Sequence, residues 1–395
     1  MSNAVPDDAD PVAKIGDLAA SAGVRRVHVL AWRDLDDVEA GGSELHIAEV
    51  AKLWAAAGVE VTMRTSWAQG QPVEATRDGY RVIRRAGRYQ VFPRAALAEI
   101  TRRTGPRDVL IEIWNGMPFL SPLWNPGPRV VLLHHVHADM WNMTLGPTLG
   151  PIGALFESRV APPLYRRSSI ATLSESSKRE LVDDLGFDPA RVTVVHPGID
   201  PRYTPGGEKS PVPLVAAVSR MAPVKRCDML VRAAHHARRA VPDLRLHLVG
   251  DGYDRPSVEA AVRELDAADW VTLRGPVGDD EKIQLMREAW IIGSASAREG
   301  WGMTLTEAAA CGTPAVATRI AGHADAVREG RTGLLADGDP ASLGDAMARV
   351  LADGDLRARL SAGALDWAGE LTWSSTATRL MRVVADEVSR RRHRR

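Results

Sequence analysis

Short apolar runs alternate along the chain with polar loops and with segments of helical periodicity. The run at residues 27–32 predicts a strand, and the run at 59–63, which follows Gly58, predicts the next. Between them lies a helix whose buried face is marked by apolar side chains at i, i+3, i+4 and i+7: Ile47, Val50, Ala51 and Trp54. A strand, a helix and a second strand in this order are typical of a parallel sheet with crossover helices.

The same alternation continues to the end of the chain. Further strands are predicted at 108–114, 130–133, 170–173, 192–195, 214–218, 244–249, 271–273, 290–294 and 315–317. Helices are predicted at 228–239, 341–352, 355–368 and 374–390. The segment 201–212, with several Pro and Gly, is the best linker in the chain. The pattern therefore predicts an α/β fold with two Rossmann-like, parallel-sheet domains.

We expect a flexible N-terminus at 1–23, a first domain at 24–204, a second at 205–372 and a final helix with a basic tail at 373–395. Residues 1–22 are acidic and lack the apolar centre of a signal peptide. No apolar run approaches the length of a transmembrane helix.

Net charge and cysteine content indicate which partners and which cellular compartment to expect. Lys plus Arg and Asp plus Glu number 50 each, so the formal net charge is zero and nothing favours nucleic acid as a partner. Cys227 and Cys311 are far apart and form no zinc spacing, which predicts a reduced, cytoplasmic protein.

One stretch combines the strongest candidate chemistry. Glu299 and Glu307 lie eight positions apart and flank the turn 300–302. Residues 304–311 are free of Gly and Pro and rich in Ala, which predicts a helix that Gly312 ends. Glu299 would then stand on a loop before the helix, and Glu307 about one turn inside it.

A helix N-terminus offers unpaired amides to an anion such as a diphosphate. Here the amides near Met303, Thr304 and Leu305, after Gly302, would be free for this role. Carboxylates beside such a site could accept hydrogen bonds from sugar hydroxyls.

This stretch resembles the Glu-x7-Glu motif of retaining nucleotide-sugar glycosyltransferases of family 4, which have two Rossmann-like domains facing a cleft (GT-B architecture). The similarity includes the glycines after Glu299 and the Cys-Gly-Thr-Pro that follows the helix, 311–314. It implies a transferase that moves a hexose from a GDP- or UDP-sugar, with retention, to a sugar-containing acceptor such as a glycan, glycolipid or small molecule.

Two cations follow the predicted strand 214–218. Arg220 and Lys225 stand on the loop before the next helix, where they can neutralise a diphosphate leaving group. Their Arg-x4-Lys spacing matches the family. A solvated basic loop is the alternative.

The resemblance implies further contacts with the donor. Glu307 would accept from the ribose and Glu299 from the sugar hydroxyls, while Gly42 would touch the phosphate or sugar. Gly250 would border the nucleotide, and the backbone at Arg274 would face its base. A histidine after the strand 130–133 contacts the transferred sugar in the family, and His134 is the best match, with His137 second and His135 also in the run.

Catalysis would consist of positioning and stabilisation of the leaving diphosphate. No metal-ligand spacing is visible, so we expect neither metal nor other cofactor. Two alternatives stay open: a non-catalytic sugar-nucleotide-binding protein, and an epimerase or phosphorylase of the same fold.

The apolar segment 141–167 is either a capping segment of the core or an acceptor- or membrane-facing surface. The final helix crosses back to the first domain in this architecture. Its basic end, 390–395, could attract anionic lipids at the inner face of the membrane, or could be a solvated tail.

Overall fold

The computed structural model describes residues 10–137 and 140–393, and the chain divides into two compact units. The first comprises Met1–Gly198 and Trp373–Arg395, and the second comprises Ile199–Thr372. The boundary therefore precedes Ile199 rather than residue 205, because the Pro- and Gly-rich linker segment already belongs to the second unit.

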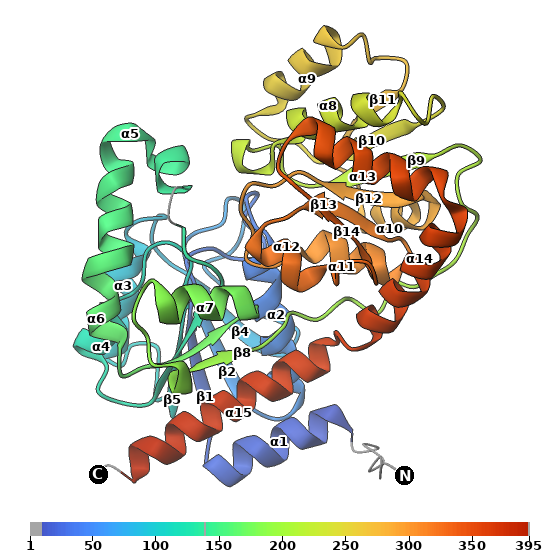
Figure 1. The fold of residues 1–395 in the computed structure, drawn as a ribbon. Coiled ribbons are helices and arrows are strands. Elements are labelled where there is room, and N and C mark those ends of the chain that lie inside the picture. The colour runs from blue at the N-terminus through green and yellow to red at the C-terminus, as the bar shows by residue number, and fades with distance from the viewer. Residues whose placement is uncertain (1–9, 138–139, 394–395) are drawn as a thin grey trace. The chain divides into compact units, whose positions relative to one another are not determined.

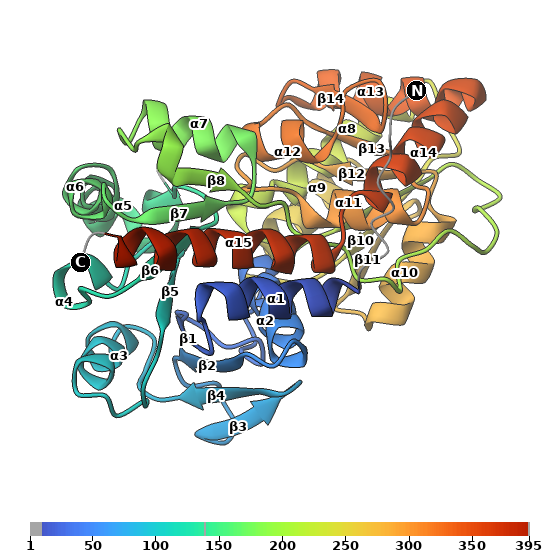
Figure 2. The same ribbon diagram turned by 90° about the horizontal axis from the view of Figure 1, so that it is seen from below.

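Strands of the first unit form one sheet in the order β3-β4-β2-β1-β5-β6-β7-β8 (Figures 1 and 2). Neighbouring strands run parallel, except that β3 is antiparallel to β4. The strands are β1 (Arg26–Leu30), β2 (Glu60–Thr65), β3 (Glu74–Arg77), β4 (Tyr80–Arg84), β5 (Val109–Trp114), β6 (Arg129–Leu133), β7 (Ser169–Thr172) and β8 (Val192–Val194).

Helices cover both faces of this sheet. They are α1 (Pro11–Ala22), α2 (Gly42–Ala56), α3 (Val91–Ile100), α4 (Ser121–Trp124), α5 (Met140–Leu155), α6 (Ala161–Tyr165), α7 (Glu175–Asp183) and α15 (Trp373–Arg392). A short π-helical turn, Phe156–Val160, joins α5 to α6, and the 3₁₀ turn Pro189–Arg191 precedes β8. Helix α5 is interrupted at Gly146, whose φ is 74°.

The N-terminal segment is part of the core from residue 11 on, so the prediction of a flexible terminus up to residue 23 was wrong. Helix α1 begins at Pro11 after the Asp10 cap and buries Ile15 and Ala19. It packs beside α15, as both ribbon views show, and α15 adds Leu380, which is fully buried, to the same cluster. This apolar contact holds α1 and α15 against each other.

Strands of the second unit form a parallel sheet in the order β11-β10-β9-β12-β13-β14. They are β9 (Leu214–Val218), β10 (Arg245–Val249), β11 (Val271–Gly275), β12 (Ile291–Ser294), β13 (Ala315–Thr318) and β14 (Gly333–Ala336). The helices are α8 (Cys227–Ala237), α9 (Arg255–Glu264), α10 (Asp279–Glu288), α11 (Met303–Ala310), α12 (Ala321–Ala326), α13 (Pro340–Ala352) and α14 (Gly354–Gly369), and a 3₁₀ turn, Pro223–Lys225, precedes α8.

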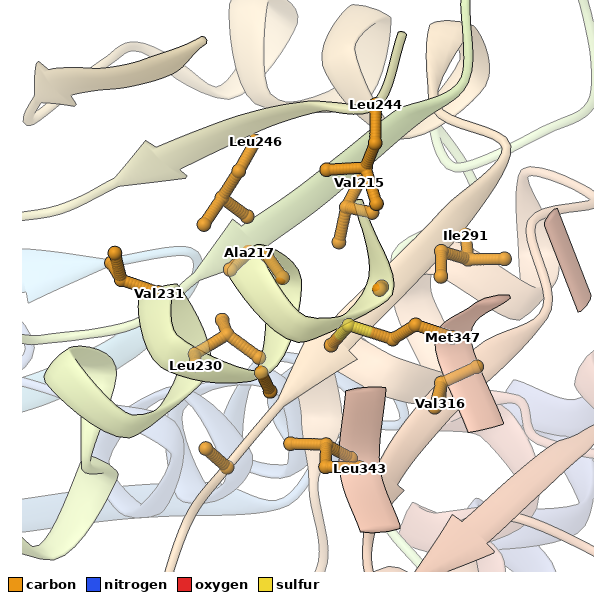
Figure 3. Close-up of a cluster of buried hydrophobic side chains, with 14 of the residues drawn as sticks. Val215, Ala217, Leu230, Val231, Leu244, Leu246, Ile291, Val316, Leu343 and Met347 are labelled. Atoms are coloured by element: carbon orange, nitrogen blue, oxygen red, sulfur yellow. The ribbon is translucent and has the colours of Figure 1, made fainter. Parts of the chain in front are cut away.

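The core of the second unit lies where α8 and α13 pack against the central strands. Figure 3 shows Leu230 of α8 and Met347 of α13 among the side chains of Val215 and Ile291 from β9 and β12. The central strands β9, β12 and β13 are almost entirely buried, as expected of a parallel sheet with helices on both faces. This core fixes the strand ends from which the loops described below depart.

Among the described residues, no helix combines the length and the apolar character needed to cross a membrane.

Candidate active site

The loop after β9 carries the two predicted cations. Arg220 follows the strand by two residues and is exposed, and Lys225 ends the 3₁₀ turn before α8. Arg226, next in the chain, has a φ of 49° and donates to the carbonyl of Gly338. This bend starts α8 and leaves Lys225 directed toward the Glu299 loop.

Glu299 is the centre of a short network inside the second unit. Its Oε1 accepts from the Nζ of Lys225 and, at 2.8 Å, from the hydroxyl of Ser296. Burial alone would raise the pKa of Glu299, but the Lys225 ammonium and the other hydrogen bonds outweigh it and lower the pKa to about 2. The carboxylate is therefore ionised, and it holds a lysine at the end of β9.

Gly322 brings a second backbone against the Glu299 loop. A Cβ at Gly322 would overlap the carbonyl group of Glu299 and the amide of Trp301, so only glycine fits there. The next residue, His323, is buried, and its Nδ1 lies 2.9 Å from the carbonyl oxygen of Thr318. Its Nε2 lies 3.3 Å from the hydroxyl of Ser294.

Burial lowers the pKa of His323, so the ring is neutral, with Nδ1 donating to Thr318. Neither Gly322 nor His323 was among the predicted site residues. The signal that could have found them is Ala-Gly-His at 321–323, two residues beyond the strand 315–318 and on the same side of the sheet as the Glu299 loop.

The N-terminus of α11 offers fewer free amides than predicted. Gly302 precedes the helix with a φ of 122°, and the amide of Leu305 donates to its carbonyl at 3.0 Å. The prediction of a free amide at Leu305 was therefore wrong, because the first turn is tight. The amides of Met303 and Thr304 have no acceptor among the described residues, and they stay available to an anion.

Glu307 lies inside α11 and is 7 % exposed. Burial raises the pKa of this carboxyl, although Lys282 of α10, with its Nζ 3.7 Å from Oε2, acts in the opposite direction. Tyr203, whose own pKa is raised by burial and by Glu307, lies nearby beneath Lys282. Within the described chain, Oε2 has no hydrogen-bond partner. Its contact with Lys282 is an ion pair beyond hydrogen-bond distance, so a ligand hydroxyl could still donate to this buried oxygen.

Gly250 and its neighbour Gly252 pack directly on the loop that carries Arg220. A Cβ at Gly250, whose φ is 120°, would overlap the carbonyl of Ser219, and a Cβ at Gly252 would overlap that of Met221. Arg274, at the end of β11, pairs with Glu281 at 3.1 Å. The predicted Gly250 therefore packs against the loop that carries Arg220. The side chain of Arg274 is directed toward α10.

Gly42 and His134 both belong to the first unit, where Gly42 opens the helix after β1 and His134 follows β6. Helix α2 begins at Gly42, and Gly41 is the residue that precedes it. The Gly41 amide and the Ser43 hydroxyl both donate to Oε2 of Glu44, at 2.9 and 2.8 Å. Asn115, after β5, donates to the Ser43 hydroxyl at 3.1 Å. These contacts tie the glycine loop to the end of β5.

His134, immediately after β6, is 3 % exposed and packs edge-on against His46 of α2, with ring centroids 5.4 Å apart. Burial, then the neighbouring imidazole, lowers the pKa of His134 well below its ordinary value, and burial lowers that of His46 to about 4. Both rings are therefore neutral. All four ring nitrogens are buried without a hydrogen-bond partner within the described chain.

The other two histidines of the run lie apart from this pair. His137 stacks on His135 at 4.7 Å, and its amide donates to Glu157. Trp141 packs on His137 and donates to the same carboxylate at 2.8 Å. These contacts join α5 to the π-helical turn, and they are structural in kind. In the part of the chain that the structure describes, no group of three or more metal-ligating side chains occurs.

Comparison with known proteins matches both halves of the chain to described families. Residues 40–203 match the family model Glycosyltransferase Family 4, and residues 205–367 match Glycosyl transferases group 1.

Two relatives are D-inositol 3-phosphate glycosyltransferases. The protein of Stackebrandtia nassauensis is 37 % identical over 243 residues, which is 56 % of this chain and 55 % of that protein. The protein of Thermomonospora curvata is 33 % identical over 392 residues, which is 87 % of this chain and 90 % of that protein.

Solved structures share the fold at low identity. Sucrose-phosphate synthase from Thermosynechococcus elongatus has a TM-score of 0.76 at 19 % identity and covers 90 % of this chain and 97 % of its own. HepE of Anabaena, solved in complex with UDP-glucose, has a TM-score of 0.69 at 19 % identity, with 90 % and 98 % covered. They confirm the predicted fold of two parallel-sheet α/β domains.

Proposed function

This chain belongs to the glycosyltransferases of family 4, and we propose that it transfers a hexose from a nucleotide-diphosphate sugar to an acceptor with retention of the anomeric configuration. The observation that carries the proposal is the Lys225–Glu299 pair beside the open N-terminus of α11. A cation, free amides and an ionised carboxylate together suit a charged leaving group and the sugar attached to it.

The diphosphate would be held from two directions. Arg220 and Lys225 supply positive charge from the loop after β9, and the amides of Met303 and Thr304 donate from α11. As the glycosidic bond breaks, negative charge grows on the β-phosphate, and these groups stabilise it more than they stabilise the ground state. The bond electrons leave with the diphosphate, whose oxygen can take the acceptor proton.

Two carboxylates would bind the two ends of the donor, namely its ribose and its transferred sugar. Glu307, whose buried Oε2 accepts no hydrogen bond from the described residues, suits the ribose hydroxyls. Glu299, fixed by Lys225 and Ser296, suits hydroxyls of the transferred sugar. Gly42 and the neutral His134 belong to the first unit, where each is by itself a candidate for contact with a sugar. This scheme uses no metal.

The test is a thermal-shift screen of UDP- and GDP-sugars, followed by transfer assays with the donor that binds. A ligand that binds the native state raises its melting temperature. Product analysis by NMR then gives the anomeric configuration. Donor binding without transfer or hydrolysis would favour a non-catalytic binding protein, and conversion of the donor alone would favour an epimerase.

Relatives named for D-inositol 3-phosphate suggest the class of acceptor. We extend the proposal to a small polyol or sugar that carries a phosphate group. Transfer assays with inositol 3-phosphate and with unphosphorylated inositol as the matched control test this extension.

A further inference from the structure

We propose that Arg64 and Ser66, at the end of β2 in the first unit, form a binding site for a phosphate group. Both side chains are buried, at 8 % and 0 % exposure. The proposal deepens the proposed function and rests on it in one respect, namely that the phosphate belongs to the acceptor.

Arg64 is a buried cation that has no partner among the described residues. Within the described chain its guanidinium makes no hydrogen bond and no ion pair, and its Nε is fully enclosed. Buried charges are ordinarily paired, because an unpaired one loses its hydration without compensation. Arg84, on the neighbouring strand β4, follows this rule, since it pairs with Asp34 at 2.7 Å.

Carboxylates near Arg64 already serve other cations. Glu99 and Glu74 attract Arg64 electrostatically, but neither reaches it. Glu99 binds His28 at 3.0 Å and Arg107 at 2.5 Å. Glu74 binds Arg81 and Arg85, at 2.6 and 2.9 Å. With Arg64 included, four guanidinium groups thus share two carboxylates, which leaves this part of the surface positive and able to attract an anion.

Ser66 provides a second unpaired polar group in the same place. Residues two apart share a face of a strand, so Ser66 lies above Arg64 on that face. Its amide donates to the carbonyl of Trp32 at 3.0 Å, which continues the strand, while its Oγ has no partner among the described groups. The register Thr65↔Arg84 places Arg85 beside Ser66 on the adjacent strand.

A planar guanidinium beside a hydroxyl fits a phosphate group better than it fits a neutral sugar. The guanidinium donates two parallel hydrogen bonds to phosphate oxygens, and the hydroxyl donates a third. The small part of Arg64 that stays exposed is where such a ligand would reach it. The carboxyl ends of β1, β2 and β4, where the site lies, are the ligand-binding edge of a parallel sheet.

Inorganic phosphate and inositol 3-phosphate are the probes, measured by calorimetric titration. All proteins carry Lys225→Ala, so that the diphosphate site of the second unit contributes little. We expect Arg64→Gln to weaken binding of both probes about ten- to a hundredfold, and Ser66→Ala to weaken it less. Arg232→Gln, an arginine of the second unit that pairs with Glu264, is the matched control and should bind like the parent. A parent that binds neither probe, or an Arg64→Gln that binds like it, overturns the site.

Stability separates a binding role from a structural one. Loss of an uncompensated buried charge should leave the melting temperature of Arg64→Gln equal to or above that of the parent without phosphate. A clear fall would make Arg64 a structural residue and overturn the proposal. Binding of inositol 3-phosphate at least tenfold tighter than inorganic phosphate assigns the site to the acceptor, and equal affinity assigns it to free phosphate.

Binding and kinetic measurements distinguish a failure of the Arg64 site from a failure of the proposed transferase function. If the chain is not a transferase, UDP- and GDP-sugars fail to bind the unmutated protein while phosphate binding still depends on Arg64. If the transferase proposal holds and the Arg64 site fails, donors bind and react normally and Arg64→Gln leaves the KM for the acceptor unchanged.

Discussion

Lys225 and Glu299, which are 74 positions apart in the chain, form an ion pair between the loop after β9 and the loop after β12. Each is about four-fifths buried, so the pair is well shielded from solvent. In the absence of donor, the carboxylate keeps the lysine in place and supplies its counter-charge. A diphosphate would then share a cation that is already oriented.

We expect Lys225→Ala and Arg220→Ala each to lower turnover by about one to two decades, because each removes charge-assisted contacts worth roughly 1.5–3 kcal/mol. Steady-state kinetics measures the effect, and circular dichroism checks that the fold is intact. Arg232→Ala, on the exposed face of α8, is the control and should keep full activity. Full activity in both variants would remove these residues from the site.

Glu299 and Glu307 should separate kinetically. Contacts with the sugar strengthen as the glycosidic bond breaks, so Glu299→Gln should depress kcat more than donor affinity. Contacts with the ribose are equal before and during reaction, so Glu307→Gln should weaken nucleoside diphosphate by about one to two decades. Calorimetry with the diphosphate and turnover with the matched donor measure both. The reverse pattern would exchange the two roles.

Glu299 should make the stability of the protein depend on acidity. Its folded pKa of about 2 lies below the ordinary 4.5, so its stabilising contribution is complete above pH 4.5 and is lost as the pH falls toward 2. The full contribution is of order 3 kcal/mol. Urea unfolding between pH 6 and pH 3 should therefore show a smaller loss of stability in Glu299→Gln than in the unmutated chain. Parallel curves would show that the pair is weaker than its geometry indicates.

Gly322→Ala should lower stability by about 1–3 kcal/mol, because the added methyl group pushes against the backbone of the Glu299 loop. Activity should fall with it, since the carboxylate moves. Gly369→Ala is the control, because a Cβ there meets nothing within 4 Å. Thermal melts and donor kinetics on both variants measure the difference. Equal melting temperatures would show that the loop yields without strain.

Activity should persist in excess chelator. The described residues hold no cluster of metal-ligating side chains, and cations from the protein surround the proposed diphosphate site. The measurement compares initial rates with EDTA, with added magnesium and with added manganese. Loss of activity in EDTA that either metal restores would contradict the scheme.

The fold was predictable because most of its strands are short apolar runs, and such runs can be recognised in the sequence without knowledge of distant contacts. The hairpin β3–β4 was not predicted, because its strands are short and partly polar. Its turn, Asp78-Gly79, has positive φ at both residues and is the sequence signal that could have found it.

The site was predictable where one residue type at one spacing carries the chemistry, as at Glu299 and Glu307. Contacts between distant segments were not. Gly322 against Glu299 depends on how two loops meet, and the engaged amide of Leu305 depends on the tightness of one turn. That Arg64 has no partner among the described residues depends on its three-dimensional surroundings, which no local sequence pattern encodes.

The second unit is inserted into the first, and its two ends meet, since the amide of Ile199 donates to the carbonyl of Leu371. The ribosome therefore synthesises the whole second unit before it synthesises α15. Because Leu380, Met381 and Val384 of α15 fill the first core, that core stays incomplete until translation is nearly finished. The second unit should therefore fold before the first. A chain that ends before residue 373 should contain a folded second unit attached to an incomplete, aggregation-prone first unit.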